Sequence, residues 1–557
     1  MRKLIKPSRP NSLKSRKQNS NKNGDTEKKI PENPIQQSLL EPDIENNLQR
    51  IKEVFKDCSD VVYREFLFAQ QEDIKLALVY MDGLVDETIV SDQIMKALTL
   101  EAAMATPPSD ISKARAYHLI KERGLCTQQI KETVKLAKVV DAVLAGDTVL
   151  LVDGHASAII NGARGWKARQ VEDAKTEMSI RSPREAFVET LRVNTALLRR
   201  KIKSTDLKME MLKIGRLTQT DVAVVYIQGI VNDGLVKEVK KRLQRIDIDG
   251  VLESGYLEEM IQDNPFSPFP NVNHTERPDR LAAKILEGRV GIMVDGTPFV
   301  LTVPTTFFEY MQAAEDYYER FPTGTAVRVI RYLSLVLSLL APSLYIAQVS
   351  FHQEMLPTSL LLSLAAQREA VPFPVLVEAL LMEISFEILR EAGLRLPRQV
   401  GQAVSIVGAL IVGQAAVQAG LVAPATVITV AITGISSFVF FYQMGIAIRL
   451  LRFPLMVLSA TLGLFGLISG IILIITHLCT MRSFGTPYLS PVAPMKISDM
   501  KDYIFRAPRW AMIKRPSLLG VKNVQRMKRH QKPKPPENQS GAKGGTKNHA
   551  GRGKNQH

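Results

Sequence analysis

The sequence has few cysteines and lacks the common signature motifs of enzymes. Its three cysteines, Cys58, Cys126 and Cys479, lie far apart and form no CxxC pair, which argues against a disulfide framework and a zinc site. No Walker A motif, G-x-S-x-G elbow or H-E-x-x-H pair is present. Asp153 and His155 stand at a predicted Asp-Gly turn, which is ordinary turn chemistry. We therefore expect no enzyme activity, no metal site and no cofactor.

The first residues also lack the apolar core of a secretory signal. The opening stretch MRKLIKPSRPNSLKS is positively charged, but no apolar segment follows it. Such a beginning is not a signal peptide. We expect the N-terminal soluble region to be cytoplasmic.

Positive charge is gathered at the two ends of the chain. The net charge is +16, with ten Lys and Arg against two acids in residues 1–30 and fourteen against one in residues 506–557. Both ends are rich in polar residues and glycine, which predicts disordered basic tails over residues 1–39 and 517–557. Trp510 is the only aromatic residue in these ends, too few for a nucleic-acid stacking platform. Anionic lipid headgroups are the expected partner, not nucleic acid.

Long apolar runs follow the soluble part. Residues Tyr332–Phe351 carry no charge, and residues Gln399–Ile448 contain no Asp, Glu, Lys or Arg and are interrupted once, at Gly420–Pro424. A further apolar run covers Phe453–Thr480. Runs of this length can cross a hydrocarbon core of about 30 Å. We predict an all-α, multi-pass membrane domain over residues 326–482, with about five or six membrane segments.

Basic residues between the runs suggest an orientation, because cytoplasmic loops are enriched in Lys and Arg. All three basic groups can face the cytoplasm if the segment after Pro372 crosses once. The last run must then fold back as a hairpin, or Leu356–Glu369 must dip into the membrane, for the basic C-terminal tail to be cytoplasmic. The sequence leaves these alternatives open. The three groups are Arg328 and Arg331; Arg390, Arg395 and Arg398; and Arg449 and Arg452.

An internal repeat organises the soluble part. The segment Leu76–Glu87 resembles Val222–Asp233, and Gly146–Ile160 resembles Gly288–Thr302. Each copy has an apolar β-rich run, then a helical pattern, then two short strands that meet at a Val-Asp-Gly turn. The repeat predicts two tandem α/β subdomains, residues 40–163 and 164–325, the second beginning with a helical linker. The turn glycines, Gly154 and Gly296, should have positive φ or a close neighbour.

Four glutamates interrupt the apolar pattern of Pro372–Gly393. On a helix, Glu383, Glu387 and Glu391 fall within an arc of about 80°, and Glu378 lies about 140° away. Pairs of Glu387 with Arg390 and of Glu391 with Arg395 would explain the C-terminal half.

No cation lies near Glu378 or Glu383 in the sequence. Acids at membrane depth usually face a bundle interior or a water-filled path. Glu383, Glu378 and Glu387 are therefore candidates for an ion path. We expect Glu383→Gln to leave folding almost unchanged, because it removes a buried charge.

Small residues recur at a spacing of four. They favour close helix packing, although small residues are common in membrane helices in general. One stripe is Gly401, Ser405, Ala409 and Gly413, and the pattern recurs at Gly466 and Gly470.

The segment Pro372–Phe438 strongly resembles the A subunit of the GerA family of bacterial spore germination receptors. Residues Pro322–Thr358 and the juxtamembrane stretch SFGTPYLSPVAP, within residues 483–516, resemble the same family. The resemblance implies a subunit of a nutrient germinant receptor in the spore inner membrane. It also implies a transporter-like B subunit that binds the nutrient, a lipoprotein C subunit, and A subunits that assemble into an ion channel.

Three classes of function follow. In a cation channel, one glutamate per copy, Glu383 first, would form a ring. The alternative is a non-conducting scaffold that couples the nutrient-binding partner to other proteins. A secondary transporter ranks last, because the only repeat is in the soluble part. The nutrient, the copy number and the gate residue are left open.

Overall fold

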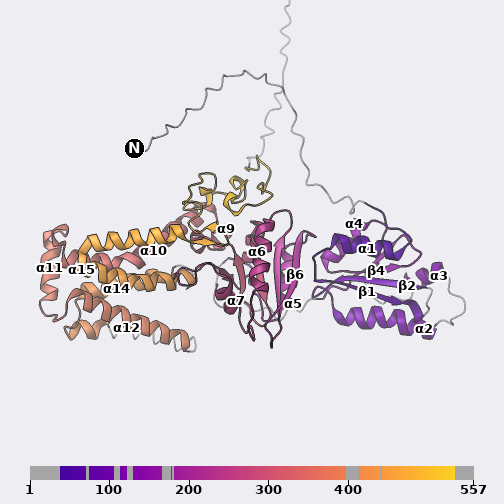
Figure 1. Cartoon of the computed structure of the whole chain (residues 1–557), viewed down its shortest axis with the longest axis horizontal. Coiled ribbons are helices and arrows are strands. Elements are labelled where there is room, and N and C mark those ends of the chain that lie inside the picture. The colour runs from indigo at the N-terminus through magenta and orange to yellow at the C-terminus, as the bar shows by residue number, and fades with distance from the viewer. Residues whose placement is uncertain are drawn as a thin grey trace, which may run out of the picture.

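The computed structural model describes residues 38–70, 74–105, 113–121, 130–165, 177, 181–396, 413–439 and 442–533. Two α/β subdomains lie side by side, and the second lies between the first and an elongated group of helices (Figure 1). The predicted N-terminal tail lies almost wholly outside the described residues, as does the C-terminal tail beyond residue 533.

The first subdomain is an antiparallel sheet in the order β1-β2-β4-β5-β3 with both faces covered. Ala77 and Val79 of β2 pack toward α1 and α4, whereas Leu76 and Leu78 pack toward the opposite layer of short helices. The alternation explains why this strand is apolar at successive positions. The elements are α1 (Ile44–Val54), β1 (Val61–Leu67), η2 (Phe68–Gln70), β2 (Lys75–Met81), η3 (Ile89–Met95), η4 (Ala97–Glu101), α2 (Ala102–Ala105), α3 (Lys113–Leu119), β3 (Ile130–Thr133), α4 (Leu136–Ala145), β4 (Thr148–Val152) and β5 (Ala158–Asn161).

The second subdomain has the same strand order, β6-β7-β9-β10-β8, and again every pair is antiparallel. Helices α6 and α7 cover one face of its sheet, and α5 and α8 cover the other. The elements are α5 (Leu191–Lys201), β6 (Leu207–Ile214), β7 (Thr220–Ile227), α6 (Asp233–Gln244), α7 (Ser254–Ile261), β8 (Asn273–Thr275), α8 (Pro278–Leu286), β9 (Val290–Val294), β10 (Val300–Val303), η7 (Phe307–Met311) and α9 (Glu315–Tyr318).

The two copies of the sequence repeat also share a register. Leu76 pairs with Val152 in the first sheet, and Val222 pairs with Val294 at the matching place in the second. Both Val-Asp-Gly turns have the predicted backbone, with φ of +84° at Gly154 and +90° at Gly296. Two similar α/β halves with matching turns are what the repeat predicts, whereas the domain boundaries drawn from the sequence stay predictions.

A buried ion pair joins the two subdomains. Arg199 of α5 donates two hydrogen bonds of 2.9 Å to Asp60, which precedes β1. Backbone hydrogen bonds run beside it, because the Ser59 amide donates to Met209 and the Met209 amide donates to Asp57. Removing either charge would leave the other buried and unpaired, so we expect the subdomains to move as one unit.

The helical part contains, among the described residues, two helices long and apolar enough to cross a membrane. These are residues Phe321–Ser350 and Gln443–Thr480, and the apolar helix Pro424–Ser437 is shorter. The predicted set of five or six membrane segments therefore stays a prediction. The elements are α10 (Phe321–Ser350), η8 (Gln353–Met355), α11 (Thr358–Arg368), α12 (Val375–Arg395), α14 (Pro424–Ser437) and α15 (Tyr442–Thr480).

Helix α15 folds back on itself at Gly463, whose φ of 61° and ψ of −142° are not helical. A side chain added at Gly466 would meet the carbonyl oxygen of Leu458 at 2.1 Å, so the two halves touch. Met444 and Leu478, near opposite ends of α15, belong to one hydrophobic cluster. Of the two alternatives for the last apolar run, the structure therefore has the hairpin.

The C-terminal segment returns to the second subdomain. It contains β11 (Arg482–Ser483), β12 (Thr486–Pro487) and three short 3-10 helices, Met500–Asp502, Arg509–Ala511 and Ser517–Leu519. Arg515 donates to the carbonyl oxygen of Leu286, and Lys522 pairs with Asp233 at 2.5 Å. Residues 517–526, assigned to a disordered tail from the sequence, thus include contacts with this subdomain.

Candidate functional site

The first candidate site is the line of acids on α12. Glu383 is 0% exposed and pairs with Arg452 of α15 at 2.5 Å. Arg452 is 1% exposed and also donates to the carbonyl oxygen of Ser338 on α10, at 3.0 Å. One buried carboxylate and one buried guanidinium therefore tie three helices together.

Sequence reasoning missed this pair. The sequence places Arg452 in a basic group that can face the cytoplasm, whereas in the structure it is part of α15 and is buried against α10 and α12. Nothing in the chain within several residues of Glu383 signals a partner 69 positions away. The only available sign was an arginine next to a long apolar run, which is costly there unless it has a partner.

Glu378 has a different environment. It is buried and accepts hydrogen bonds from the Ala423 amide at 2.9 Å and the Thr426 hydroxyl at 3.1 Å. These groups form the first turn of α14, where free amides and the helix dipole favour an anion. Arg368 of α11 lies 3.4 Å from its other oxygen. Glu378 therefore holds α11, α12 and α14 together.

Toward the other end of α12 the acids make the pairs expected from the sequence. Glu387 pairs with Arg390 and, at 3.3 Å, with Arg449 of α15. Glu391 pairs with Arg395 at 2.7 Å, and both side chains are exposed. The four acids thus run from full burial at Glu378 and Glu383 to an exposed side chain at Glu391 along one helix.

The buried acids are not fully satisfied. One carboxylate oxygen, Oε1, of each of Glu378, Glu383 and Glu387 has no hydrogen-bond partner among the described residues. Buried polar atoms in folded proteins are nearly always bonded to protein or to ordered water. Oε1 of Glu378 still lies 3.4 Å from Arg368, whereas Oε1 of Glu383 and Oε1 of Glu387 are places where water or a cation would be favourable.

The predicted small-residue stripe is only partly described. Gly401, Ser405 and Ala409 lie outside the described residues, and Gly413 faces Val427 of α14. Gly466 and Gly470 lie where the two halves of α15 meet. A side chain added at Gly470 would come within 2.4 Å of Leu455. These two glycines permit the close approach within the hairpin.

A second group of charges joins α10 to the rest of the molecule. Asp316 is buried and contacts Arg328 at 3.1 Å and Arg331 at 3.0 Å. Arg328 also pairs with Asp502 of the C-terminal segment at 2.8 Å, and Tyr317 donates to the same carboxylate. The first turns of α10 are thereby fixed to both α9 and the C-terminal segment.

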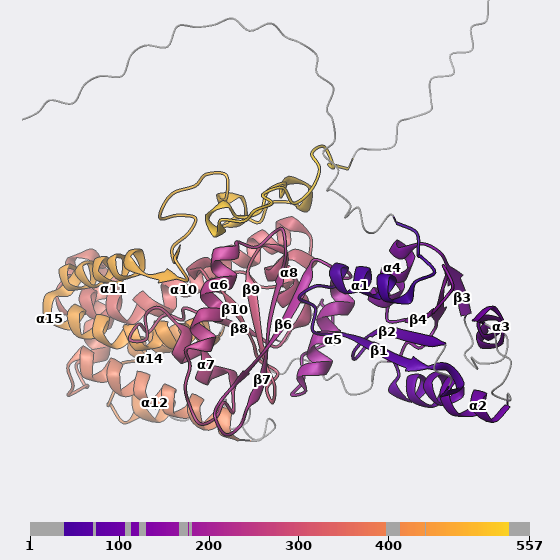
Figure 2. The same ribbon diagram turned by 45° about the vertical axis from the view of Figure 1, so that its right-hand side comes forward.

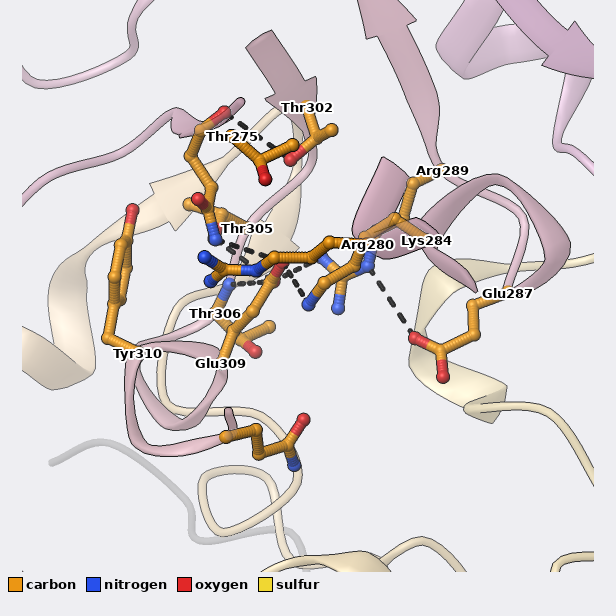
Figure 3. A network of polar contacts seen from close by, with 12 residues as sticks. Thr275, Arg280, Lys284, Glu287, Arg289, Thr302, Thr305, Thr306, Glu309 and Tyr310 are labelled. Atoms are coloured by element: carbon orange, nitrogen blue, oxygen red, sulfur yellow. Dashed lines mark hydrogen bonds and ion pairs between the residues drawn. The ribbon is translucent and has the colours of Figure 1, made fainter. Parts of the chain in front are cut away.

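A third group lies deeper in the second subdomain (Figure 3). Glu309 is buried and contacts Lys284 and, at 2.6 Å, Arg289, while Thr305 donates to it at 3.0 Å. Burial alone would raise the pKa of Glu309, but Arg289 and Lys284 outweigh burial and bring it to about 2. Burial, with Arg289 adding to it, lowers the pKa of Lys284 to about 8. The cluster fixes η7, which leads from the sheet to α10.

A metal centre is not suggested by the described part of the chain, which contains no group of three or more His, Cys, Asp or Glu able to hold an ion. Asp153, at the first Val-Asp-Gly turn, pairs with Lys113 at 2.5 Å, and His155 stacks on Tyr117. These contacts are those of an ordinary turn.

Comparisons with known proteins agree along most of the chain. The model of the Bacillus/Clostridium GerA spore germination protein family matches residues 49–518. Spore germination protein KA of Bacillus subtilis (strain 168) is 45% identical over 498 residues, covering 89% of this chain and 90% of that protein. Spore germination protein GerLA of Bacillus cereus is 36% identical over 485 residues, covering 87% and 97%.

Among solved structures, the N-terminal domain of the A subunit of the Bacillus megaterium spore germinant receptor GerK3 is 35% identical. The match covers 48% of this chain and 98% of the chain in that structure, with a TM-score of 0.38. The family match extends through both subdomains, the helices and most of the C-terminal segment. On this evidence, the chain belongs to the GerA family of spore germination proteins.

Proposed function

We propose that this chain is the A subunit of a nutrient germinant receptor that spans the spore inner membrane, and that several copies form a path for cations leaving the spore. Family membership and the two long apolar helices indicate membrane association. The residues 442–462 and 464–480 of the hairpin are about 30 Å and 25 Å long, close to the thickness of a hydrocarbon core.

The observation that carries the cation path is the pair of unbonded carboxylate oxygens, Oε1 of Glu383 and Oε1 of Glu387, on one face of α12. Water in a path beside this helix would satisfy them, and their negative charge would favour cations over anions. Glu383 is the first candidate, with Glu378 and Glu387 on either side of it. We assign the described arrangement to a resting state, in which Arg452 neutralises Glu383.

A non-conducting scaffold is the alternative, and one observation favours it. Glu383 and Arg452 are almost fully enclosed by the helices of a single chain. A buried pair of this kind can have a purely structural role, in which it fixes how the helices pack. A scaffold would use these charges for assembly and would carry no ions.

A double substitution distinguishes the cation path from the scaffold. Glu383→Gln together with Arg452→Gln removes both charges, and replacing a buried pair as a unit costs little compared with breaking it. We expect spores that carry the double variant at normal abundance to release far less monovalent cation after nutrient is added. Normal cation release per receptor, with abundance measured by immunoblot, would favour the scaffold.

The proposed partners follow from the family. They are a transporter-like B subunit, whose nutrient binding gates the path, a lipoprotein C subunit, and further copies of this chain. Anionic lipid headgroups would bind the basic tails. The C-terminal segment contacts the second subdomain, so both lie on the same side of the helices, which we propose is the cytoplasmic side. Co-purification of the three subunits from spore membranes tests the assembly, and its absence would contradict it.

A further inference from the structure

The loop between α7 and β8 presents one phenylalanine and buries another. In the proline-rich stretch Asn264–Pro270, Phe266 is 100% exposed. Phe269 is buried and packs edge-on against Phe307. Three prolines alternate with these residues and restrict the backbone, so the loop holds Phe266 outward instead of letting it collapse onto the core.

This loop lies at the end of a long apolar helix. The hydroxyl of Ser267 is 2.9 Å from Nε2 of His477 and also contacts the Met481 sulfur. His477 is in the last turn of α15, and the exposed apolar side chain of Leu473 lies one turn earlier. The loop that carries Phe266 therefore adjoins the end of α15, and Phe266 extends the exposed apolar residues of this helix toward the second subdomain. Helix α7 of that subdomain lies on the side that faces the helices (Figures 1 and 2).

A second exposed phenylalanine has the corresponding place beside α10. Tyr332 donates its hydroxyl hydrogen to the carbonyl of Tyr503, and Thr325 donates to the carbonyl of Arg506. Phe505, between these two contacts, is exposed and lies alongside the first turns of α10. The two phenylalanines thus lie at the ends of the two helices that are long and apolar enough to span a membrane.

We propose that Phe266 and Phe505 insert into the interfacial layer of an anionic bilayer and fix the second subdomain against the membrane surface. Aromatic side chains are enriched at this depth, and basic side chains favour anionic headgroups. Arg482, Lys501 and Arg509 are exposed in the same C-terminal segment. The inference rests on the proposed membrane placement of α10 and α15.

Tryptophan fluorescence in the full-length chain tests this. The background replaces Trp166 and Trp510, the only two tryptophans, with phenylalanine. Single tryptophans are then placed at Phe266, at Phe505, at Ile472 on the exposed side of α15, and at Met104 of α2 as a control. Met104 is 89% exposed and apolar, and α2, which contains it, lies at the end of the molecule far from α10 and α15 (Figure 1).

The chain is reconstituted in phosphatidylcholine–phosphatidylglycerol vesicles with and without bromine on the acyl chains, which quenches nearby tryptophan. We expect emission from Phe266→Trp and Phe505→Trp to fall to about half or less in brominated vesicles, as for aromatic residues in an interfacial belt. Emission from Ile472→Trp should fall at least as far, and emission from Met104→Trp should not change.

If Ile472→Trp is quenched but Phe266→Trp and Phe505→Trp are not, the interfacial contact is wrong while the membrane placement stands. A blue-shifted, unquenched signal at these two positions would show that protein, such as a second copy, covers them, which also overturns the inference. If Ile472→Trp is not quenched either, the membrane placement itself fails, and the inference fails with it.

Discussion

The two α/β subdomains share a strand order but differ in the helix before their fourth strand in sequence order. In the first, α4 buries only apolar side chains, among them Leu136 and Val139. In the second, α8 occupies the same place but carries Lys284, which reaches Glu309. The first copy therefore has an apolar helix where the second has a charged contact with the segment leading to α10.

This difference between α4 and α8 indicates where the two α/β subdomains are coupled to the helices. The charges around Glu309 and Asp316 lie between the second sheet and α10. In the part of the chain that the structure describes, the matching face of the first subdomain contacts no such segment. Specific charge pairs fix geometry more sharply than apolar packing, which tolerates sliding. We infer that the second subdomain, through the charges around Glu309 and Asp316, is the joint between the α/β region and the helices. The first subdomain is attached to it through Asp60 and Arg199.

The largest expected effect is at the joint. Glu309→Gln leaves Lys284 and Arg289 without their shared anion, and breaking a buried pair costs about 3–5 kcal/mol. Thermal unfolding of the full-length chain in detergent measures the loss. The matched control is Glu132→Gln in the first subdomain, which breaks the partly exposed pair with Lys121 and changes the acceptor of the Tyr117 hydroxyl. Equal losses at the two positions would remove the contrast between the subdomains.

The same carboxylate predicts a pH dependence. Because the pKa of Glu309 is lowered from 4.5 to about 2, it contributes stability that is fully present above pH 4.5 and is lost as the pH falls through about 2. The loss amounts to about 3 kcal/mol. Melting temperatures of the wild type should therefore fall more steeply over this range than those of Glu309→Gln. Parallel pH profiles would show that Glu309 is not held ionised.

Substitutions in the two Val-Asp-Gly turns, which have the same backbone in both subdomains, should cost less stability. Gly154→Ala and Gly296→Ala place a side chain at positive φ, which costs about 1 kcal/mol each. A side chain at Gly296 meets open space, whereas one at Gly154 comes within 2.9 Å of the flexible Lys113 chain, so Gly154→Ala should lose slightly more. Unfolding of the two variants in parallel measures this. A loss of several kcal/mol at Gly296 alone would mean that the turns are not equivalent.

The smallest expected effect is that of Glu391→Gln on α12, a helix on which an exposed charge pair and a buried one can be compared. Glu391→Gln breaks an exposed pair and should cost less than about 1 kcal/mol. Glu383→Gln alone should cost several times more, because it leaves Arg452 buried without an anion. Melting temperatures of the two single variants compare them directly. Similar small losses would show that the Arg452 site is hydrated.

That comparison corrects an expectation. From the sequence, Glu383→Gln should have left folding almost unchanged, since it removes an isolated buried charge. The structure shows that Glu383 is paired with Arg452, so the substitution leaves the buried charge of Arg452 without a partner. Contacts between residues 69 positions apart depend on how helices pack, which a helix's own periodicity does not encode.

Much of the soluble fold, by contrast, could be predicted from local signals. The repeated apolar segments and the two Asp-Gly turns predicted matching halves, because a strand and its turn are encoded within about ten residues. The pairs Glu387–Arg390 and Glu391–Arg395 were predictable for the same reason. The hairpin at Gly463 was left as one of two alternatives, since a glycine within an apolar run is also common in unbroken membrane helices.

We propose that this chain conducts cations through a path lined by α12. The most direct measurement is potassium flux through liposomes that contain the purified full-length chain with its partner subunits, before and after nutrient is added. We predict flux that appears with nutrient and falls at least about tenfold in the Glu383→Gln, Arg452→Gln double variant, because the ring of charge is lost. Intact, correctly assembled receptor that binds nutrient but passes no potassium would contradict the claim.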